Sequence, residues 1–190
     1  IFPSLPSGMD KILKDYFDGF IEKGTLPPEL KELDDEVKLF DDLSLLSIWR
    51  SNFKGIQWTD DKGNVLRGAV DNILKKGDKL IVLDYKTRGF PLKNDTAKHY
   101  QNQLDIYNFL LRKNGYETED YSYLVFYYPE KANGDSSIIF KTELVKMDID
   151  VDNALKILNN ALDVLSKDMP EPAEACEYCK WVENCSCENK

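Results

Sequence analysis

The feature that most constrains the fold is a short apolar run that ends in charged residues. Residues 80–83 read Leu-Ile-Val-Leu, and Asp84, Tyr85 and Lys86 follow without a break. An apolar run of this length between turn signals predicts a strand that is buried on both faces. Because side chains alternate along a strand, Asp84 and Lys86 point to the same face and Tyr85 to the other. Burying a carboxylate and an ammonium is costly unless they pair or serve a ligand, so the end of this strand predicts a functional site.

Helices and strands are predicted on both sides of this strand. Apolar residues at helical spacing predict helices over residues 8–22, 41–52, 96–113 and 152–166. β-prone segments between turn residues predict strands over residues 55–59, 64–74, 79–87, 121–128 and 137–146. The helix at 96–113 connects two of these strands in a βαβ unit, so they are expected to be parallel neighbours. This order predicts an α/β domain with a mixed central sheet flanked by helices.

The length of 190 residues suits one domain with a small appendage. We predict a domain over residues 1–168 and a cysteine-containing tail over residues 169–190, which a proline-containing linker introduces. No apolar run approaches the roughly 18 residues that a membrane-spanning helix needs, so no membrane partner is expected. Cysteines clustered in a chain without a signal-peptide pattern indicate a reducing compartment, and we expect the cytoplasm.

The formal net charge of −9 limits the ways in which this chain can meet nucleic acid. A protein this acidic lacks the broad positive field that drives non-specific binding to duplex DNA, which argues against a DNA-coating role. An enzyme needs only a local basic channel, and a bound divalent cation reverses the sign of a carboxylate-rich pocket. The net charge therefore does not exclude a nuclease.

A second carboxylate, Asp71, lies on the chain segment that runs into the Asp84 strand. If the two segments are antiparallel neighbours, the carboxylates approach each other and repel unless a cation lies between them. Oxygen ligands of this kind favour Mg²⁺ or Mn²⁺, which would lower the pKa of a bound water. Lys86 could then orient that water as a fixed cation. Gln103 and Tyr107 share one face of the next helix and could hold Lys86, the water or a phosphate.

Three ordered motifs, Gly68-x-x-Asp71, Asp84-Tyr85-Lys86-Thr87 and Gln103-x-x-x-Tyr107, resemble those of the RecB-like branch of the PD-(D/E)XK nucleases. That branch includes exonuclease domains of recombination helicases and the CRISPR-adaptation nucleases with an iron–sulfur cluster. The resemblance implies a restriction-endonuclease-like fold. It also implies catalytic roles for Asp71, Asp84, Lys86, Gln103 and Tyr107, with the metal held by Asp71, Asp84 and the backbone carbonyl of Tyr85.

The activity that the resemblance implies is metal-dependent hydrolysis of phosphodiester bonds in DNA. Single strands or ends are the expected substrate, as for an exonuclease in DNA repair, recombination or defence, with a helicase as a candidate protein partner. Members of the branch often carry an upstream histidine or glutamate as a further metal ligand, whereas His99 follows the motif here. Glu36, Asp41 and Asp42 are candidate substitutes. The alternative function is a catalytically inactive nuclease-like module that binds DNA or a protein.

The four cysteines lie close together near the end of the sequence, at Cys176, Cys179, Cys185 and Cys187. Four thiolates at this spacing resemble a metal knuckle and suit tetrahedral Zn²⁺ or a [4Fe–4S] cluster. The iron–sulfur branch also uses a cysteine near the N-terminus, and none precedes Cys176 here. Free thiols in a frayed tail are the alternative.

Aromatic and basic residues outside these motifs could contact a DNA strand. Trp49, Arg50, Lys54 and Arg88 are candidates, because stacking on bases tolerates any sequence. Core packing is the favoured role of Trp49.

Overall fold

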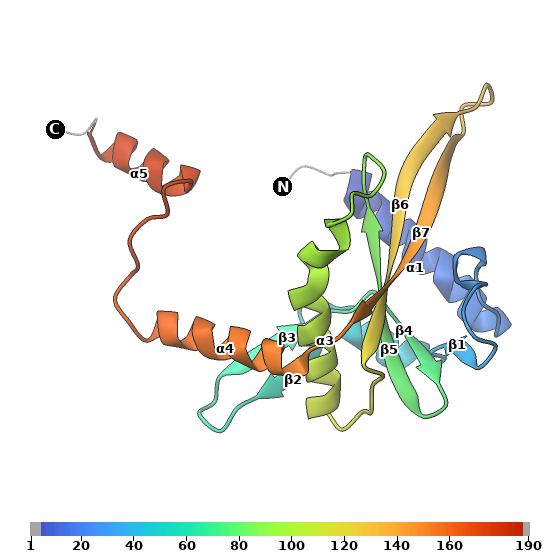
Figure 1. Ribbon diagram of the computed structural model, residues 1–190, viewed down its shortest axis with the longest axis horizontal. Coiled ribbons are helices and arrows are strands. Elements are labelled where there is room, and N and C mark those ends of the chain that lie inside the picture. Colours follow the sequence, from blue (N-terminus) through green and yellow to red (C-terminus); the bar gives the residue numbers. More distant parts are fainter. Residues whose placement is uncertain (1–4, 188–190) are drawn as a thin grey trace. The chain divides into compact units, whose positions relative to one another are not determined.

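The computed structural model describes residues 5–187, apart from the side chains of residues 183, 184, 186 and 187. The chain divides into two compact units, residues 1–155 and 156–190. Figure 1 shows the course of the chain. The helices are α1 (Leu5–Lys23), α2 (Leu43–Trp49), α3 (Gln101–Lys113), α4 (Val151–Leu165), α5 (Glu177–Cys187) and the 3₁₀ turns η1 (Pro28–Leu30) and η2 (Thr96–Tyr100). The strands are β1 (Val37–Leu39), β2 (Ile56–Thr59), β3 (Val65–Gly68), β4 (Asn72–Lys76), β5 (Lys79–Thr87), β6 (Tyr121–Ala132) and β7 (Ile138–Asp148).

A five-stranded mixed sheet in the order β1-β4-β5-β6-β7 forms the centre of the first unit. β5 runs parallel to β6, and the other neighbouring pairs are antiparallel. The parallel pair is joined through η2 and α3, as the βαβ pattern predicts. The mixed sheet flanked by helices confirms the predicted α/β, restriction-endonuclease-like fold class.

Each face of β5 is covered by one helix. α1 buries Leu13, Phe17 and Ile21, which recur one turn apart along one side of the helix. The Phe17 ring packs on Tyr85 with their centroids 4.5 Å apart, so α1 covers the Tyr85 face. Since strand neighbours point to opposite faces, α3 covers the face that carries Asp84.

The strand predicted over residues 64–74 is wrong as one element, because it breaks in the middle. Its first part, β3, pairs with β2 in a separate hairpin, and its second part, β4, joins the main sheet. Gly68 ends β3 against α3, where an added Cβ would lie 2.8 Å from the Tyr107 ring. Asp71 falls in the break, one residue before β4 begins. The break moves the chain from the hairpin to the sheet and leaves the Asp71 side chain outside the strand ladder.

The second unit holds the C-terminal part of α4, which was predicted over residues 152–166, and the helix α5. Sequence patterns did not predict α5. The unit begins inside α4. A boundary at residue 168 stays a prediction. None of the helices within the described residues is both long and apolar enough to cross a membrane.

Candidate active site

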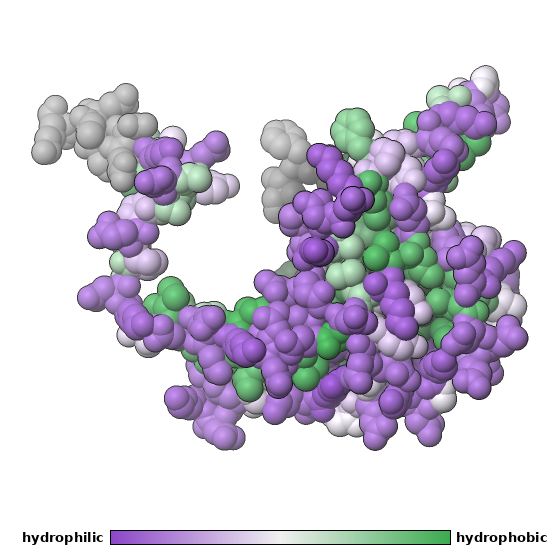
Figure 2. Space-filling view, viewed as in Figure 1, coloured by the Kyte–Doolittle hydropathy of each residue, from purple (hydrophilic) through white to green (hydrophobic). Residues whose placement is uncertain are grey.

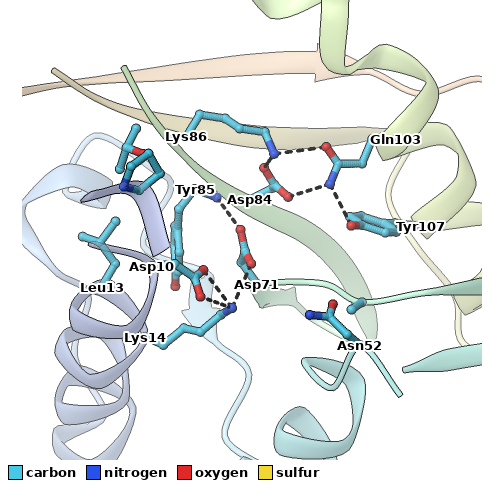
Figure 3. A pocket seen from close by; sticks show the side chains of 13 residues that line it. Asp10, Leu13, Lys14, Asn52, Asp71, Asp84, Tyr85, Lys86, Gln103 and Tyr107 are labelled. Atoms are coloured by element: carbon cyan, nitrogen blue, oxygen red, sulfur yellow. Dashed lines mark hydrogen bonds and ion pairs between the residues drawn. The ribbon is translucent and has the colours of Figure 1, made fainter. Parts of the chain in front are cut away.

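A cavity of about 420 Å³ opens beside the end of β5 (Figure 3). Its lining comes from α1, the segment after α2, the break before β4, the end of β5 and α3. The lining residues are Pro6, Asp10, Leu13, Lys14, Asn52, Ala69, Asp71, Asp84, Tyr85, Lys86, Thr87, Gln103 and Tyr107. The structure thus brings together all six residues that the sequence motifs assign to the active site.

One wall of the cavity is a connected set of polar groups around Lys86. Its ammonium forms an ion pair with Oδ2 of Asp84, whose side chain is almost fully buried. Lys86 Nζ also donates to Gln103 Oε1 at 3.0 Å and lies 4.6 Å from the centroid of the Tyr100 ring. Gln103 Nε2 lies 3.2 Å from Asp84 Oδ1 and 2.7 Å from the Tyr107 hydroxyl. Tyr107 therefore reaches Lys86 through Gln103, and the lysine is fixed from three sides.

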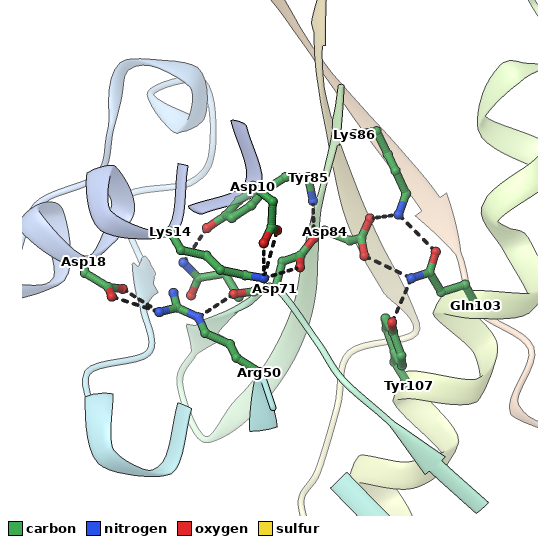
Figure 4. A network of polar contacts seen from close by, with 11 residues as sticks. Asp10, Lys14, Asp18, Arg50, Asp71, Asp84, Tyr85, Lys86, Gln103 and Tyr107 are labelled. Carbon is green, nitrogen blue, oxygen red and sulfur yellow. Dashed lines mark hydrogen bonds and ion pairs between the residues drawn. The ribbon is translucent and has the colours of Figure 1, made fainter. Parts of the chain in front are cut away.

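Asp71 is held by its main chain and its side chain together (Figure 4). Its Oδ2 accepts a 3.0 Å hydrogen bond from the backbone N–H of Tyr85, which ties it to β5. Its carbonyl accepts a 2.7 Å bond from Nε of Arg50. Arg50 is anchored in turn by Asp18 of α1, at 2.8 Å. The guanidinium thus holds Asp71 in place, and a contact of Arg50 with DNA stays a prediction.

Lys14 and Asp10 of α1 belong to the cavity although no motif marked them. Lys14 Nζ lies 2.8 Å from a carboxylate oxygen of Asp10 and 3.3 Å from Oδ1 of Asp71. The ammonium therefore stands on the open side of Asp71, where it neutralises part of the carboxylate charge. The only sequence signal was their spacing of one helical turn, which is common on solvated helices.

A family model described as the PD-(D/E)XK nuclease superfamily matches residues 5–186. The chain belongs to this superfamily. The match runs from α1 into α5, so it covers most of both units and includes Cys176, Cys179 and Cys185. No curated protein matches the chain significantly. Membership confirms the superfamily that the motifs indicated, and assignment to the RecB-like branch stays a prediction.

The electrostatics of this PD-(D/E)XK site centre on Asp84. Burial, and then the neighbouring charge of Asp71, raises the pKa of Asp84 to about 7, although Lys86 acts in the opposite direction. Burial also raises the pKa of Tyr107 to about 12, so its phenol stays protonated at neutral pH. Burial lowers the pKa of Lys14, but its contacts with Asp10 and Asp71 outweigh this and raise the pKa overall. The cavity thus holds the cations Lys14 and Lys86 beside three carboxyl groups, of which Asp71 and Asp84 repel each other.

The donor set fits a hard divalent cation. Asp71 and Asp84 offer carboxylate oxygens, and Oδ2 of Asp84 is buried with the Lys86 ammonium as its ion-pair partner but no hydrogen bond from the described residues. A cation between the carboxylates would offset the repulsion that raises the pKa of Asp84. Residues Asp71 and Asp84 would hold Mg²⁺ or Mn²⁺. The Tyr85 carbonyl as a further ligand stays a prediction.

The candidates for an additional upstream ligand lie elsewhere. Asp42 caps α2 by accepting a hydrogen bond from Leu45 N, at 2.9 Å. Glu36 and Asp41 line a different cavity. Asp10 is the further carboxylate that lines the active-site cavity. Among the side chains that the structure describes, no three His, Cys, Asp or Glu residues are grouped closely enough to hold a metal ion.

The cysteine segment does not form a metal site among its described side chains. Cys176 precedes α5, and its sulfur accepts a 3.5 Å hydrogen bond from the backbone N–H of Cys179. This bond lowers the pKa of the Cys176 thiol. Cys185 lies on α5, and the side chain of Cys187 is outside the described residues. A Zn²⁺ or [4Fe–4S] site here stays a prediction.

The remaining candidates have different environments. Trp49 is only 4% exposed and stacks on Phe40, which confirms core packing. His99 is exposed on η2 and does not line the active-site cavity. Lys54 is exposed. Arg88 lines a neighbouring cavity.

Proposed function

We propose that this protein is a Mg²⁺- or Mn²⁺-dependent deoxyribonuclease that hydrolyses phosphodiester bonds. The observation that carries the proposal is the meeting of Asp71, Asp84 and Lys86 on one cavity wall, with the pKa of Asp84 raised to about 7. A carboxylate pair with this repulsion is suited to share a cation, and perturbed pKa values of this kind gather at functional sites. Membership of a nuclease superfamily supports the same chemistry.

In this mechanism the chain's own residues position the attacking water and the phosphate. The bound cation would supply charge neutralisation and a lower pKa for water. Lys86 is held by Asp84, Gln103 and the Tyr100 ring, so its ammonium is fixed before substrate arrives. A cation that is already in place stabilises the negative charge of a phosphoryl transition state without reorganisation. Gln103, fixed by Tyr107, keeps the ammonium in that place.

We further propose that the substrate is single-stranded DNA or DNA ends. The formal net charge of −9 opposes wide contact with duplex DNA, whereas Lys14 and Lys86 supply positive charge within the cavity. The resemblance of the motifs to RecB-like enzymes supports an exonuclease role in repair, recombination or defence. It also supports a helicase partner, and the clustered cysteines support a cytoplasmic location.

The test is incubation of labelled single- and double-stranded DNA with Mn²⁺ and either wild type or Lys86→Ala. We expect a loss of about 10²–10³-fold in kcat for Lys86→Ala, the usual cost of removing one donor to transition-state charge. Lys93→Ala, which changes an exposed lysine, is the matched control and should leave the rate unchanged. Equal rates for wild type and Lys86→Ala would exclude catalysis by this lysine. Binding of DNA without cleavage by wild type would favour the inactive-module alternative.

A further inference from the structure

A second cavity, of about 240 Å³, lies directly beside the active-site cavity. Pro6 and Thr87 line both cavities, so the two are neighbours at the end of β5. The second cavity extends from this shared rim to the β6–β7 hairpin, where Ile138 and Phe140 line it. Figure 2 shows hydrophobic side chains gathered over β6 and β7 on an otherwise largely hydrophilic face.

The lining of the second cavity combines apolar side chains with a single cation. Ile138 is 59% exposed although it is apolar, and Phe140 adds an aromatic ring. Among the described lining residues Arg88 is the one charged side chain. Its Nε is buried and has no hydrogen-bond partner in the described part of the chain. A buried donor without a partner is unfavourable, so this arginine is suited to an acceptor from outside the protein.

We propose that this cavity is a subsite for the base of a nucleotide adjacent to the scissile phosphodiester, with Arg88 contacting the phosphate of that nucleotide. This proposal rests on the proposed nuclease function. Sites for single strands combine cationic groups along the backbone with apolar and aromatic surfaces on which bases stack. The cavity offers both, and it shares Pro6 and Thr87 with the cavity in which the scissile phosphate would lie.

The dimensions and the chemistry favour a base over a larger ligand. Drug-sized molecules occupy pockets of roughly 300–1,000 Å³, and this cavity is smaller, which suits one ring system. A base can enter it only when it is unstacked from its neighbours and unpaired. Every base has an apolar π-face, so the subsite would select single-stranded DNA without selecting its sequence.

Binding to two oligonucleotides of equal length and charge tests the proposal. One is fluorescently labelled oligothymidylate, and the other carries abasic sites, which remove the bases and keep the phosphates. Fluorescence anisotropy is measured with the full chain in Ca²⁺, which prefers oxygen ligands as Mg²⁺ does. We expect wild type to bind oligothymidylate about tenfold more tightly, as the stacking of one base provides.

Matched variants separate base contacts from phosphate contacts. Ile138→Ser should remove the preference for oligothymidylate. Ile12→Ser, which changes an isoleucine that is 62% exposed on α1 and lines neither cavity, should keep it. Arg88→Gln should weaken the binding of both oligonucleotides by the same factor, because both carry phosphates. The Ile138 and Ile12 positions are solvent-exposed, so both variants are expected to fold.

Several results would overturn the subsite. These are equal affinity of wild type for the two oligonucleotides, no binding of either, or the same behaviour of Ile138→Ser and Ile12→Ser. If Ile138→Ser leaves DNA affinity unchanged and instead alters sedimentation, the cavity is a protein contact and the proposal fails. Cleavage is measured separately in Mn²⁺. Base-dependent binding without cleavage would refute the nuclease function alone, and cleavage without base dependence would refute the subsite alone.

Discussion

Replacing Lys14 with methionine should have opposite effects on the metal-free protein and on metal binding. Lys14 Nζ is shared between Asp10 and Asp71, and Asp71 is one of the two carboxylates assigned to the metal. The Lys14 ammonium thus neutralises part of the Asp71 charge in the metal-free protein, and its contact with Asp71 must break before a divalent ion can bind there. Methionine keeps most of the apolar stem of the side chain and removes the charge.

The size of the effect follows from burial. The Lys14 and Asp71 side chains are 23% and 19% exposed, so their attraction is only partly screened by water. Loss of one partner from a charge-assisted contact of this kind costs about 1–3 kcal/mol. The metal-free variant should therefore unfold more easily by about that amount. Since the metal would no longer displace a cation, the same free energy should appear as tighter binding, about tenfold for each 1.4 kcal/mol.

Calorimetric titration with Mn²⁺ and thermal denaturation with and without Mn²⁺ measure both effects on the same samples. Lys11→Met, at an exposed position on the same helix, is the control and should match wild type in both assays. Stabilisation by saturating Mn²⁺ should be larger in Lys14→Met than in wild type, by mass action. If Lys14→Met binds Mn²⁺ as weakly as wild type or more weakly, the lysine does not compete with the metal and the reasoning is refuted.

Three further predictions concern the groups around Lys86 and the close approach of α3. Because the pKa of Asp84 is raised to about 7 in the folded protein, its stabilising contribution is complete below about pH 4 and is lost as pH rises towards 7. In urea denaturation of the metal-free protein, the free energy of unfolding of wild type should fall between pH 4 and pH 7 relative to that of Asp84→Asn. If the free energies of the two proteins change with pH in parallel, the raised pKa of Asp84 is contradicted. Gln103→Leu removes the amide that joins Asp84, Lys86 and Tyr107. The kcat should fall about 10–100-fold while the circular dichroism spectrum stays unchanged. An unaltered kcat would count against a role of Gln103 in positioning Lys86. Gly68→Ala places a methyl group 2.8 Å from the Tyr107 ring and should lower the free energy of unfolding by about 1–3 kcal/mol. Gly134→Ala is the control and should cost far less, because nothing in the described structure lies within 4 Å of an added Cβ there. Equal costs of the two substitutions would show that Tyr107 moves freely.

Much of the site was predictable because its signals are local. The apolar run of β5, its polar end and the βαβ pattern depend on short-range periodicity, and the predicted strand 79–87 has the bounds of β5. The helix that carries Gln103 and Tyr107 was predicted from the same kind of signal. The motif order then indicated that Asp71 meets Asp84, and the antiparallel pairing of β4 with β5 brings this about.

The features that were missed depend on contacts between distant parts of the chain. The apolar stripe of α1 predicts a helix, but nothing in that stripe indicates that Lys14 faces Asp71. That orientation follows from packing of Phe17 on Tyr85. The break between β3 and β4 likewise depends on the approach of Tyr107 to Gly68. Local β-propensity is continuous across this segment, and tertiary packing interrupts it.

The clamp on Asp71 has a consequence for when the protein becomes active. Asp18 lies on α1 and Arg50 follows α2, and their contacts hold the main chain of Asp71, while the Tyr85 N–H of β5 holds its carboxylate. Contacts of this sequence separation form only after the intervening chain has collapsed, since loop closure must precede them. A partly folded chain can carry every catalytic motif and still lack a positioned carboxylate pair. Under the proposed function, hydrolytic capacity would therefore appear only together with the completed fold.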